Sequence, residues 1–355
     1  MAKKNRRSHA LLRYRYYLYF ILLCGLLVFA IVMIGRQAFP EKTPDVPDTP
    51  DPPAVLTDAS VLPTDPPAAE VSEAPETSVP DPTDAPPETA APAAVSGTAH
   101  ITPAAENLYV RIGRSHDVPV IPAGVGRDAL SYAVTDPNIC DVDEHGKVTG
   151  FERGSCEVIV TCGEEEVRIP VHVRELTVGE DGCTYVDGIL IVNKSYSLPE
   201  TYDPGLLPVT QEAFDRLSAD AAAQGLNIYR GSDYRSYSYQ VKVYQSMCSG
   251  YSKEYADSVS ARPGHSEHQS GYAIDCNTIE NGFAETPEGQ WLKAHCHEYG
   301  FIIRFPEGRE DVTGYTYESW HIRYVGEEVA AEIMSQDLTL EEYLDVPSVY
   351  DLEEE

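Results

Sequence analysis

Basic residues are scarce once the first forty positions have passed. The 355-residue chain has 26 Lys and Arg against 57 Asp and Glu, a formal net charge of −31. Seven of the Lys and Arg lie within residues 1–40, a segment with no acidic residue, and the remainder is acidic throughout. Nucleic-acid binding depends on a positive surface that can neutralise phosphates. The charge distribution therefore argues against nucleic acid as a partner.

Charge is absent altogether from residues 16–35, a mostly apolar run. Twenty residues at about 1.5 Å per residue are enough to cross a bilayer as a helix. Six basic residues precede this run, so the positive-inside rule predicts a cytoplasmic tail (1–15), a transmembrane anchor (16–35) and an extracytoplasmic remainder. A cleaved signal peptide is the alternative, but the run is longer than a usual signal sequence and no clear small-x-small cleavage site follows it.

Residues 36–103 lack the apolar content of a folded core. Fifteen of the 27 prolines lie between residues 40 and 100, and residues 41–100 hold twelve acids and one Lys. This composition predicts a disordered, extended linker. If the linker is largely polyproline II, at about 3.1 Å per residue it reaches on the order of 150 Å.

From residue 104 to 176 the pattern changes to short alternating strands. Val167, Ile169, Val171 and Val173 alternate with more polar residues, as expected for half-buried strands. About seventy residues of this kind predict a small all-β sandwich. The motif Asp-Val-Asp-x-x-Gly-Lys-Val-Thr-Gly at 141–150 resembles bacterial Ig-like group 2 modules. Such a module could bind the cell wall or serve as a rigid stalk.

Cysteine gives little information about this chain. Cys24 lies in the apolar run, which leaves seven cysteines in the part predicted to be exported. An odd number means that at least one thiol is free or pairs with another molecule. Their pairing cannot be predicted from the sequence.

Residues 180–347 mix helical and strand patterns and predict an α+β domain with an antiparallel sheet, followed by an acidic tail at 348–355. Thr210 is expected to cap a helix that Gly225 follows, and Thr286 to cap another that Gly300 ends. A capping box, Thr339-x-x-Glu342, predicts a short last helix.

Candidate ligands gather in the stretch 262–275, Arg-Pro-Gly-His-Ser-Glu-His-Gln-Ser-Gly-Tyr-Ala-Ile-Asp. Its glycines and proline allow a tight loop. The residues after Gly271 read as a strand that places Ala273 and Asp275 on one face. His268 in the loop and Asp275 on the strand could therefore converge on one point.

A second cluster supplies Glu318 and His321. Three protein ligands with the fourth position left to water are typical of catalytic zinc, and His268, Asp275 and His321 would be those ligands. Glu318 would stand beside the water as general base. Because residues 318 and 321 have opposite parity, a straight strand would point them to opposite faces. The hypothesis therefore requires a bend or bulge between them.

The order Ser266-x-His268-x-x-Gly-x-Ala-x-Asp275, then Glu318-x-x-His321, resembles the VanY-type zinc D-alanyl-D-alanine carboxypeptidases and their VanX dipeptidase relatives. The resemblance spans roughly residues 185–345. The sequence departs from the family pattern at two positions, with Asp233 in place of a usual Gly and Ser319 in place of a usual Pro.

The resemblance implies one Zn²⁺ per catalytic domain and a substrate in the peptidoglycan stem peptides. It also assigns to Arg235 a role in binding the substrate or the transition state. From the residues themselves, Gln240, Ser266 and Trp320 are further candidates for substrate contacts, and Arg235 offers forked donors to a carboxylate or oxyanion. His265 is a less favoured ligand than His268.

The function expected is a membrane-anchored extracytoplasmic zinc peptidase that trims peptidoglycan stem peptides, and the resemblance implies that it removes the terminal D-alanine of the D-Ala-D-Ala end. A dipeptidase or a peptidoglycan endopeptidase of the same family is the alternative within this class. A non-catalytic wall-binding surface protein is the alternative from another class. The oligomeric state cannot be predicted from the sequence.

Overall fold

The computed structural model describes residues 100–350. The predicted anchor at 16–35, nearly all of the predicted linker and residues 351–355 lie outside this range. Within residues 100–350, no helix is long and apolar enough to cross a bilayer. The anchor and the linker therefore stay predictions.

Residues 100–174 form short strands in three small sheets, with strand orders β1-β4, β2-β9-β8-β5 and β3-β7-β6. Valines from the two larger sheets, Val148 and Val158 among them, pack in one hydrophobic core, and the predicted alternation along β9 is confirmed. The strands are β1 (His100–Pro103), β2 (Leu108–Arg111), β3 (Ser115–Asp117), β4 (Val120–Ala123), β5 (Ser131–Val134), β6 (Cys140–Val142), β7 (Lys147–Gly150), β8 (Gly154–Cys162) and β9 (Glu165–Arg174).

Two details of this β region concern its first strand and its cysteines. Because β1 spans His100–Pro103, the folded region begins before residue 104. Cys140 on β6 and Cys156 on β8 bring their sulfur atoms to 2.9 Å from each other in the buried core. The resemblance to Ig-like group 2 modules stays a prediction.

The remaining described residues fold as the predicted α+β domain. A three-stranded antiparallel sheet consists of β10 (Leu176–Val178), β11 (Thr184–Val186) and β12 (Ile189–Ile191). A second, four-stranded antiparallel sheet has the order β13-β14-β16-β15. Its strands are β13 (Arg230–Ser232), β14 (Ala273–Cys276), β15 (Phe301–Phe305) and β16 (Glu318–Tyr324).

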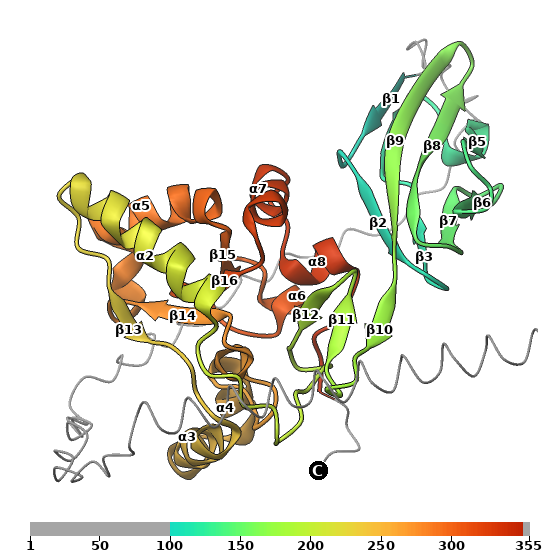
Figure 1. Ribbon diagram of the computed structural model, residues 1–355. Helices are drawn as coiled ribbons and strands as arrows, with labels where there is room; N and C mark the ends of the chain where they lie inside the picture. Colours follow the sequence, from blue (N-terminus) through green and yellow to red (C-terminus); the bar gives the residue numbers. More distant parts are fainter. Residues whose placement is uncertain (1–99, 351–355) are drawn as a thin grey trace, which may run out of the picture. The chain divides into compact units, whose positions relative to one another are not determined.

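Helices pack on both sides of the four-stranded sheet (Figure 1). Helices α2 and α5 supply Phe214 and Leu292 to a core that also contains Ile274 and Ile322 of the sheet. Helices α3 and α4 lie on the other side. The helices are α2 (Pro208–Ala223), α3 (Tyr237–Gly250), α4 (Lys253–Val259), α5 (Pro287–His295), α6 (Glu310–Thr313), α7 (Glu327–Ser335) and α8 (Leu340–Leu344), with 3-10 turns η1 (Arg127–Ala129), η2 (Glu267–Ser270), η3 (Asn281–Glu285) and η4 (Cys296–Tyr299).

The helix ends largely agree with the sequence. The Thr286 side chain accepts a hydrogen bond from the Gly289 amide and caps α5, and the capping box of Thr339 and Glu342 begins α8. The expectation that Thr210 caps α2 is wrong: this helix begins earlier, at Pro208, and Thr210 is buried inside it. Proline suits a first helical position, because the amide there needs no partner within the helix.

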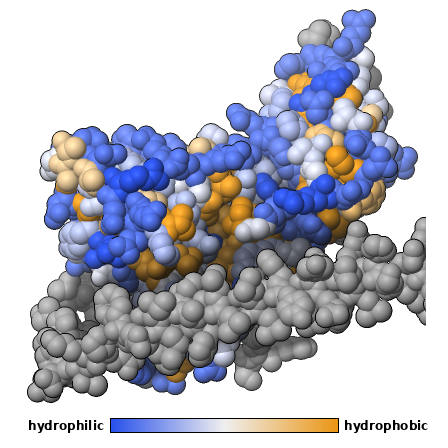
Figure 2. Space-filling view, viewed as in Figure 1, coloured by the Kyte–Doolittle hydropathy of each residue, from blue (hydrophilic) through white to orange (hydrophobic). Residues whose placement is uncertain are grey.

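On the face shown in Figure 2, hydrophilic residues predominate over the visible part of the described surface, with hydrophobic patches between them. Charge is nevertheless present deep inside the α+β domain. Arg304 of β15, which is 0% exposed, bonds to both Glu267 and Glu341. Arg323 of β16 also donates to Glu267, at 2.8 Å. The two arginines and two glutamates balance, as buried ions must if their desolvation cost is to be offset.

Glu341→Ala tests this network. The substitution leaves Arg304 buried beside Glu267, a carboxylate that it shares with Arg323. We therefore expect the free energy of unfolding to fall by ~3–5 kcal/mol. Urea unfolding followed by circular dichroism measures the change. The control is Glu328→Ala at an exposed position of α7, for which a change within about 0.5 kcal/mol is expected. Equal effects of the two substitutions would contradict the network's structural role.

Candidate active site

Strand pairing brings Asp275 and His321 together. Strands β14 and β16 are antiparallel neighbours, and their register places Asp275 directly opposite His321. Residues directly opposite each other in such a pair project from the same face of the sheet. The neighbouring pair, Ile274 and Ile322, projects into the core on the other face. The predicted alternation along this strand is thus confirmed.

The loop before β14 positions His268. This residue lies in η2, and Gly271, directly after this turn, adopts the left-handed region at φ 75°. A Cβ at Gly271 would lie 2.2 Å from the Gly205 carbonyl oxygen, so both the conformation and the space require glycine. The His268 Nδ1 atom lies 2.6 Å from the Asp233 carbonyl oxygen, which fixes the direction of the ring.

A bulge places Glu318 beside His321. Along the β15–β16 pair, Ile303 lies opposite Ile322 while Phe305 lies opposite Glu318, so β16 contains extra residues between these two points. This irregularity is the bend that the parity of residues 318 and 321 requires. As a result, Glu318 Oε2 lies 3.5 Å from His321 Nδ1.

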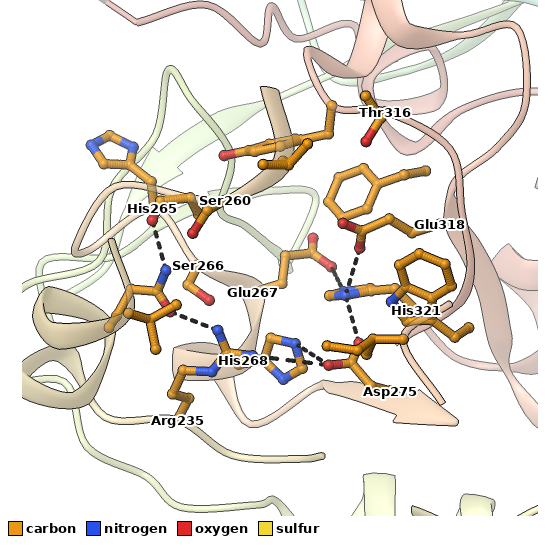
Figure 3. A pocket seen from close by; sticks show the side chains of 18 of the residues that line it. Arg235, Ser260, His265, Ser266, Glu267, His268, Asp275, Thr316, Glu318 and His321 are labelled. Atoms are coloured by element: carbon orange, nitrogen blue, oxygen red, sulfur yellow. Dashed lines mark hydrogen bonds and ion pairs between the residues drawn. The ribbon is translucent and has the colours of Figure 1, made fainter. Parts of the chain in front are cut away.

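The three predicted ligands converge on one point (Figure 3). His268 Nε2 lies 3.2 Å from Asp275 Oδ2, and His321 Nδ1 lies 3.2 Å from Asp275 Oδ1. One potential ligand atom from each residue lies within 4.8 Å of the others, and all three side chains are buried. Among the described residues, this is the one group of three or more His, Cys, Asp or Glu side chains that meets such a criterion.

The two histidines present opposite ring nitrogens to this point. The Nδ1–H of His268 donates to the Asp233 carbonyl, which leaves the lone pair of Nε2 facing Asp275. His321 faces Asp275 through Nδ1, while its Nε2 faces the buried Glu267 at 3.6 Å. A hydrogen bond at one ring nitrogen sets which nitrogen remains available as a ligand. His268 therefore directs Nε2, and His321 directs Nδ1, to the same point.

Burial and ion pairing shift the pKa of every titrating group here. Burial raises the pKa of Glu318 to about 7. Burial lowers the pKa of His268. For His321, the effect of burial is outweighed by the adjacent carboxylates of Asp275 and Glu267, which raise its pKa to about 9. Burial also acts against ionisation of Asp275, but the two histidines hold its pKa well below the usual range.

These donors fit a metal ion. Asp275 Oδ1 is buried and has no hydrogen-bond partner among the described residues, a costly arrangement unless something else binds it. Two imidazole nitrogens and one carboxylate oxygen are ligands that zinc accepts, and three protein ligands leave one position open. Imidazole suits zinc better than it suits magnesium or calcium, which prefer oxygen ligands.

A cavity of about 770 Å³ opens over this cluster. Arg235, Gln240, Ser266 and Trp320 all line it, as do side chains from α3 and α4. Arg235 NH1 donates to Gln240 Oε1 at 2.9 Å, and its NH2 lies 3.9 Å from Asp275 Oδ2. Gln240 also donates to the Ala261 carbonyl, so both ends of its amide are bound within the protein. This geometry suits Gln240 to holding Arg235 in place.

His265 lies in the cavity wall but is not part of the cluster. Its Nδ1 atom is 2.8 Å from the Asn193 carbonyl oxygen, and its ring packs edge-on against Tyr350. The Tyr350 ring also packs against Arg262, whose guanidinium carbon lies 3.9 Å from the ring centroid. The α+β domain therefore extends at least to residue 350, into the predicted acidic tail.

Sequence reasoning did not identify Glu267 as part of the site. An acid in a polar loop reads as solvated, yet Glu267 is 4% exposed and contacts His321 from the side away from Asp275. The available signal was the pair Arg304 and Arg323, charged residues within otherwise apolar strands, because a buried arginine requires an acid as partner.

Comparison with known proteins agrees with this site. The family model VanY, D-alanyl-D-alanine carboxypeptidase, matches residues 205–327. A D-alanyl-D-alanine carboxypeptidase of Enterococcus faecalis (strain ATCC 700802 / V583) is 33% identical over 189 residues, which cover 47% of this chain and 69% of the relative.

Two solved structures are also similar. The LdcB LD-carboxypeptidase is 37% identical, with 50% of this chain and 98% of that chain covered and a TM-score of 0.45. The vancomycin-resistance D,D-pentapeptidase VanY in complex with Zn(II) is 33% identical, with 43% and 97% covered and a TM-score of 0.39. The family match and the extent of the Enterococcus faecalis relative show that this chain belongs to the VanY family of D-alanyl-D-alanine carboxypeptidases.

Proposed function

We propose that the α+β domain is a zinc peptidase that removes the terminal D-alanine from peptidoglycan stem peptides ending in D-Ala-D-Ala. The observation that carries the proposal is the convergence of His268, Asp275 and His321 at the base of an open cavity, with Glu318 beside them. A protein that merely bound a peptide would need no partly buried carboxylate with a pKa near neutrality at that point.

His268 Nε2, an oxygen of Asp275 and His321 Nδ1 would hold the zinc ion. When bound, zinc supplies Lewis-acid polarisation of the scissile carbonyl and lowers the pKa of a bound water to about 7. Burial of all three ligands limits competition from bulk water and favours one coordination geometry. The open cavity leaves room for the substrate on the remaining side.

Glu318 acts as the general base. Its side chain is 16% exposed and lies at the cavity, so it can accept a proton from water there and pass it to the leaving amine. Its pKa of about 7, raised by burial, lies close to the value at which a base both is ionised and still accepts a proton well. The bulge in β16 is what brings this side chain to the ligand face.

Arg235 binds the anionic part of the substrate, either the terminal carboxylate or the oxyanion that forms during hydrolysis. A guanidinium can donate two parallel hydrogen bonds to such a group. Gln240 holds one side of the guanidinium and leaves the rest directed into the cavity. Ser266 and Trp320 form part of the wall along which the peptide lies.

The location proposed for this domain is outside the cytoplasmic membrane, with residues 16–35 as anchor and residues 36–103 as spacer. The apolar run, the basic residues before it and the proline-rich composition after it support this placement. A long spacer suits a polymeric wall substrate better than a free dipeptide.

Release of D-alanine from defined peptides tests the proposed function. The substrates are a pentapeptide ending in D-Ala-D-Ala, a tetrapeptide ending in one D-alanine, and free D-Ala-D-Ala. We expect zinc-dependent release with the pentapeptide as the best substrate. Faster release from the tetrapeptide or the dipeptide would show that the enzyme cleaves a different bond from the one proposed. Binding without release from any of the three peptides would support a wall-binding protein instead.

Glu318→Gln separates chemistry from metal binding. Loss of the general base is expected to lower kcat by about 10²–10⁴-fold, while the zinc content stays at one per chain because the three ligands remain. Zinc is measured by atomic absorption and D-alanine by a coupled oxidase assay. A variant as fast as the parent would refute the role of Glu318, even if metal binding survived.

Zinc binding is expected to release about one proton from His321. The pKa of this ring is raised to about 9 in the metal-free protein, so it carries both protons at pH 8, and Nδ1 must lose one to become a ligand. Calorimetric titrations in buffers of different ionisation enthalpy measure the release. In Glu318→Gln, which removes the carboxyl group with a pKa of about 7, the release should persist at pH 8. No release at pH 8 would contradict this assignment.

Arg235→Lys is expected to lower kcat/KM by about 10–100-fold, since one charged hydrogen bond contributes ~1.5–3 kcal/mol. Lysine keeps the charge but loses the forked donors and the bond to Gln240. The matched control is Arg216→Lys, at an exposed arginine on α2 that pairs with Glu327. Equal kinetics for the two variants would show that Arg235 does not contact the substrate.

A further inference from the structure

Glu267 occupies an unusual place in this domain. It follows Ser266 and precedes the ligand His268, yet its side chain reaches the far side of the other histidine, His321 (Figure 3). The carboxylate is 3% exposed, and it belongs to no set of converging metal-binding atoms among the described residues. Its function is therefore something other than direct coordination.

Two arginines fix the position of this carboxylate. Glu267 Oε1 accepts from Arg304 Nε at 2.7 Å and from Arg323 NH1 at 2.8 Å. Arg323 is anchored in turn by donation to the Leu190 carbonyl at 2.6 Å. With one oxygen held by two guanidinium groups, the carboxylate is anionic and cannot rotate freely. The position of its second oxygen, Oε2, is therefore fixed as well.

Glu267 Oε2 faces the Nε2 atom of His321 at a distance of 3.6 Å. Neither atom has another hydrogen-bond partner among the described residues, although both are buried. Two unpartnered polar atoms that face each other at this distance need only a small ring movement to bond, and bonds in active sites are often long in the ligand-free state. On the opposite side of the ring, Nδ1 faces Asp275 and Glu318.

We propose that Glu267 is a positioning residue, which accepts the Nε2–H of His321 and so reserves Nδ1 of this ring as a metal ligand. The inference rests on the proposed zinc site and adds the group that orients one of its ligands. His268 is oriented differently, by the neutral Asp233 carbonyl. An anionic acceptor makes the His321 ring the more basic of the two ligands, and partners of this kind typically change metal affinity by about 10–100-fold.

The chain itself provides a matched control. Glu341 binds the same Arg304 with both of its oxygens but does not contact His321. Glu267→Gln and Glu341→Gln therefore remove the same charge from the same buried network, and both are expected to lower stability in urea. Only the first removes the anionic acceptor from His321. A difference between them in metal affinity reports on positioning rather than on general stability.

The experiment measures zinc affinity of the full chain by competition with a chromogenic chelator, after removal of metal. E267Q is expected to bind zinc about 10–100-fold more weakly than the parent, and E341Q is expected to match the parent within error. In the zinc-loaded parent, histidine ¹⁵N spectra should show His321 protonated at Nε2, with exchange of this proton accelerated in E267Q alone.

Three results would overturn the inference. E267Q could keep the affinity of the parent, both variants could weaken binding equally, or the spectra could show His321 bound through Nε2. A parent that binds no zinc removes this inference together with the proposed function. A parent that binds zinc, releases no D-alanine and still shows the difference between E267Q and E341Q refutes the proposed function alone.

Discussion

The site depends on the register between β14 and β16. Because Asp275 lies directly opposite His321, a carboxylate and an imidazole face the same point without any contribution from flexible loops. A slip of one residue would exchange these side chains for Ile274 and Ile322 and bury the polar pair in the core. The packing of α2 and α5 on the apolar face therefore fixes the chemistry on the opposite face.

The remaining parts of the site are attached to this pair at short range. His268 precedes β14 by a tight turn that only glycine permits at position 271, and Glu318 precedes His321 by a bulge in the same strand. All four side chains thus come from two short segments that pair with each other. Such a site is rigid, which suits a metal ion whose ligands must be held in one geometry.

Much of this arrangement could be predicted from the sequence. The spacing of His268 and Asp275, and of Glu318 and His321, identified the cluster, and the parity of residues 318 and 321 required the bulge that the structure contains. The α+β class with an antiparallel sheet is likewise confirmed. These features could be predicted because they depend on local periodicity and on closely spaced histidines and carboxylates, which are typical metal ligands.

What could not be predicted depends on distant partners. Glu267 reads as a solvated loop acid, since its arginine partners lie 37 and 56 residues away in strands whose pairing the sequence does not specify. Gln240 reads as a substrate contact, and only the fold shows that Arg235 and the Ala261 carbonyl occupy its amide. Tertiary contacts, rather than local propensity, determine each of these.

The account's central claim is that His268, Asp275 and His321 hold one zinc ion at the base of the cavity. X-ray diffraction from crystals of the zinc-loaded protein, recorded above and below the zinc absorption edge, tests it most directly. We predict a single anomalous peak in the α+β domain, bound by these three side chains, with Glu318 beside its open position. A peak bound by other residues, or none between these three at full zinc loading, would contradict the account.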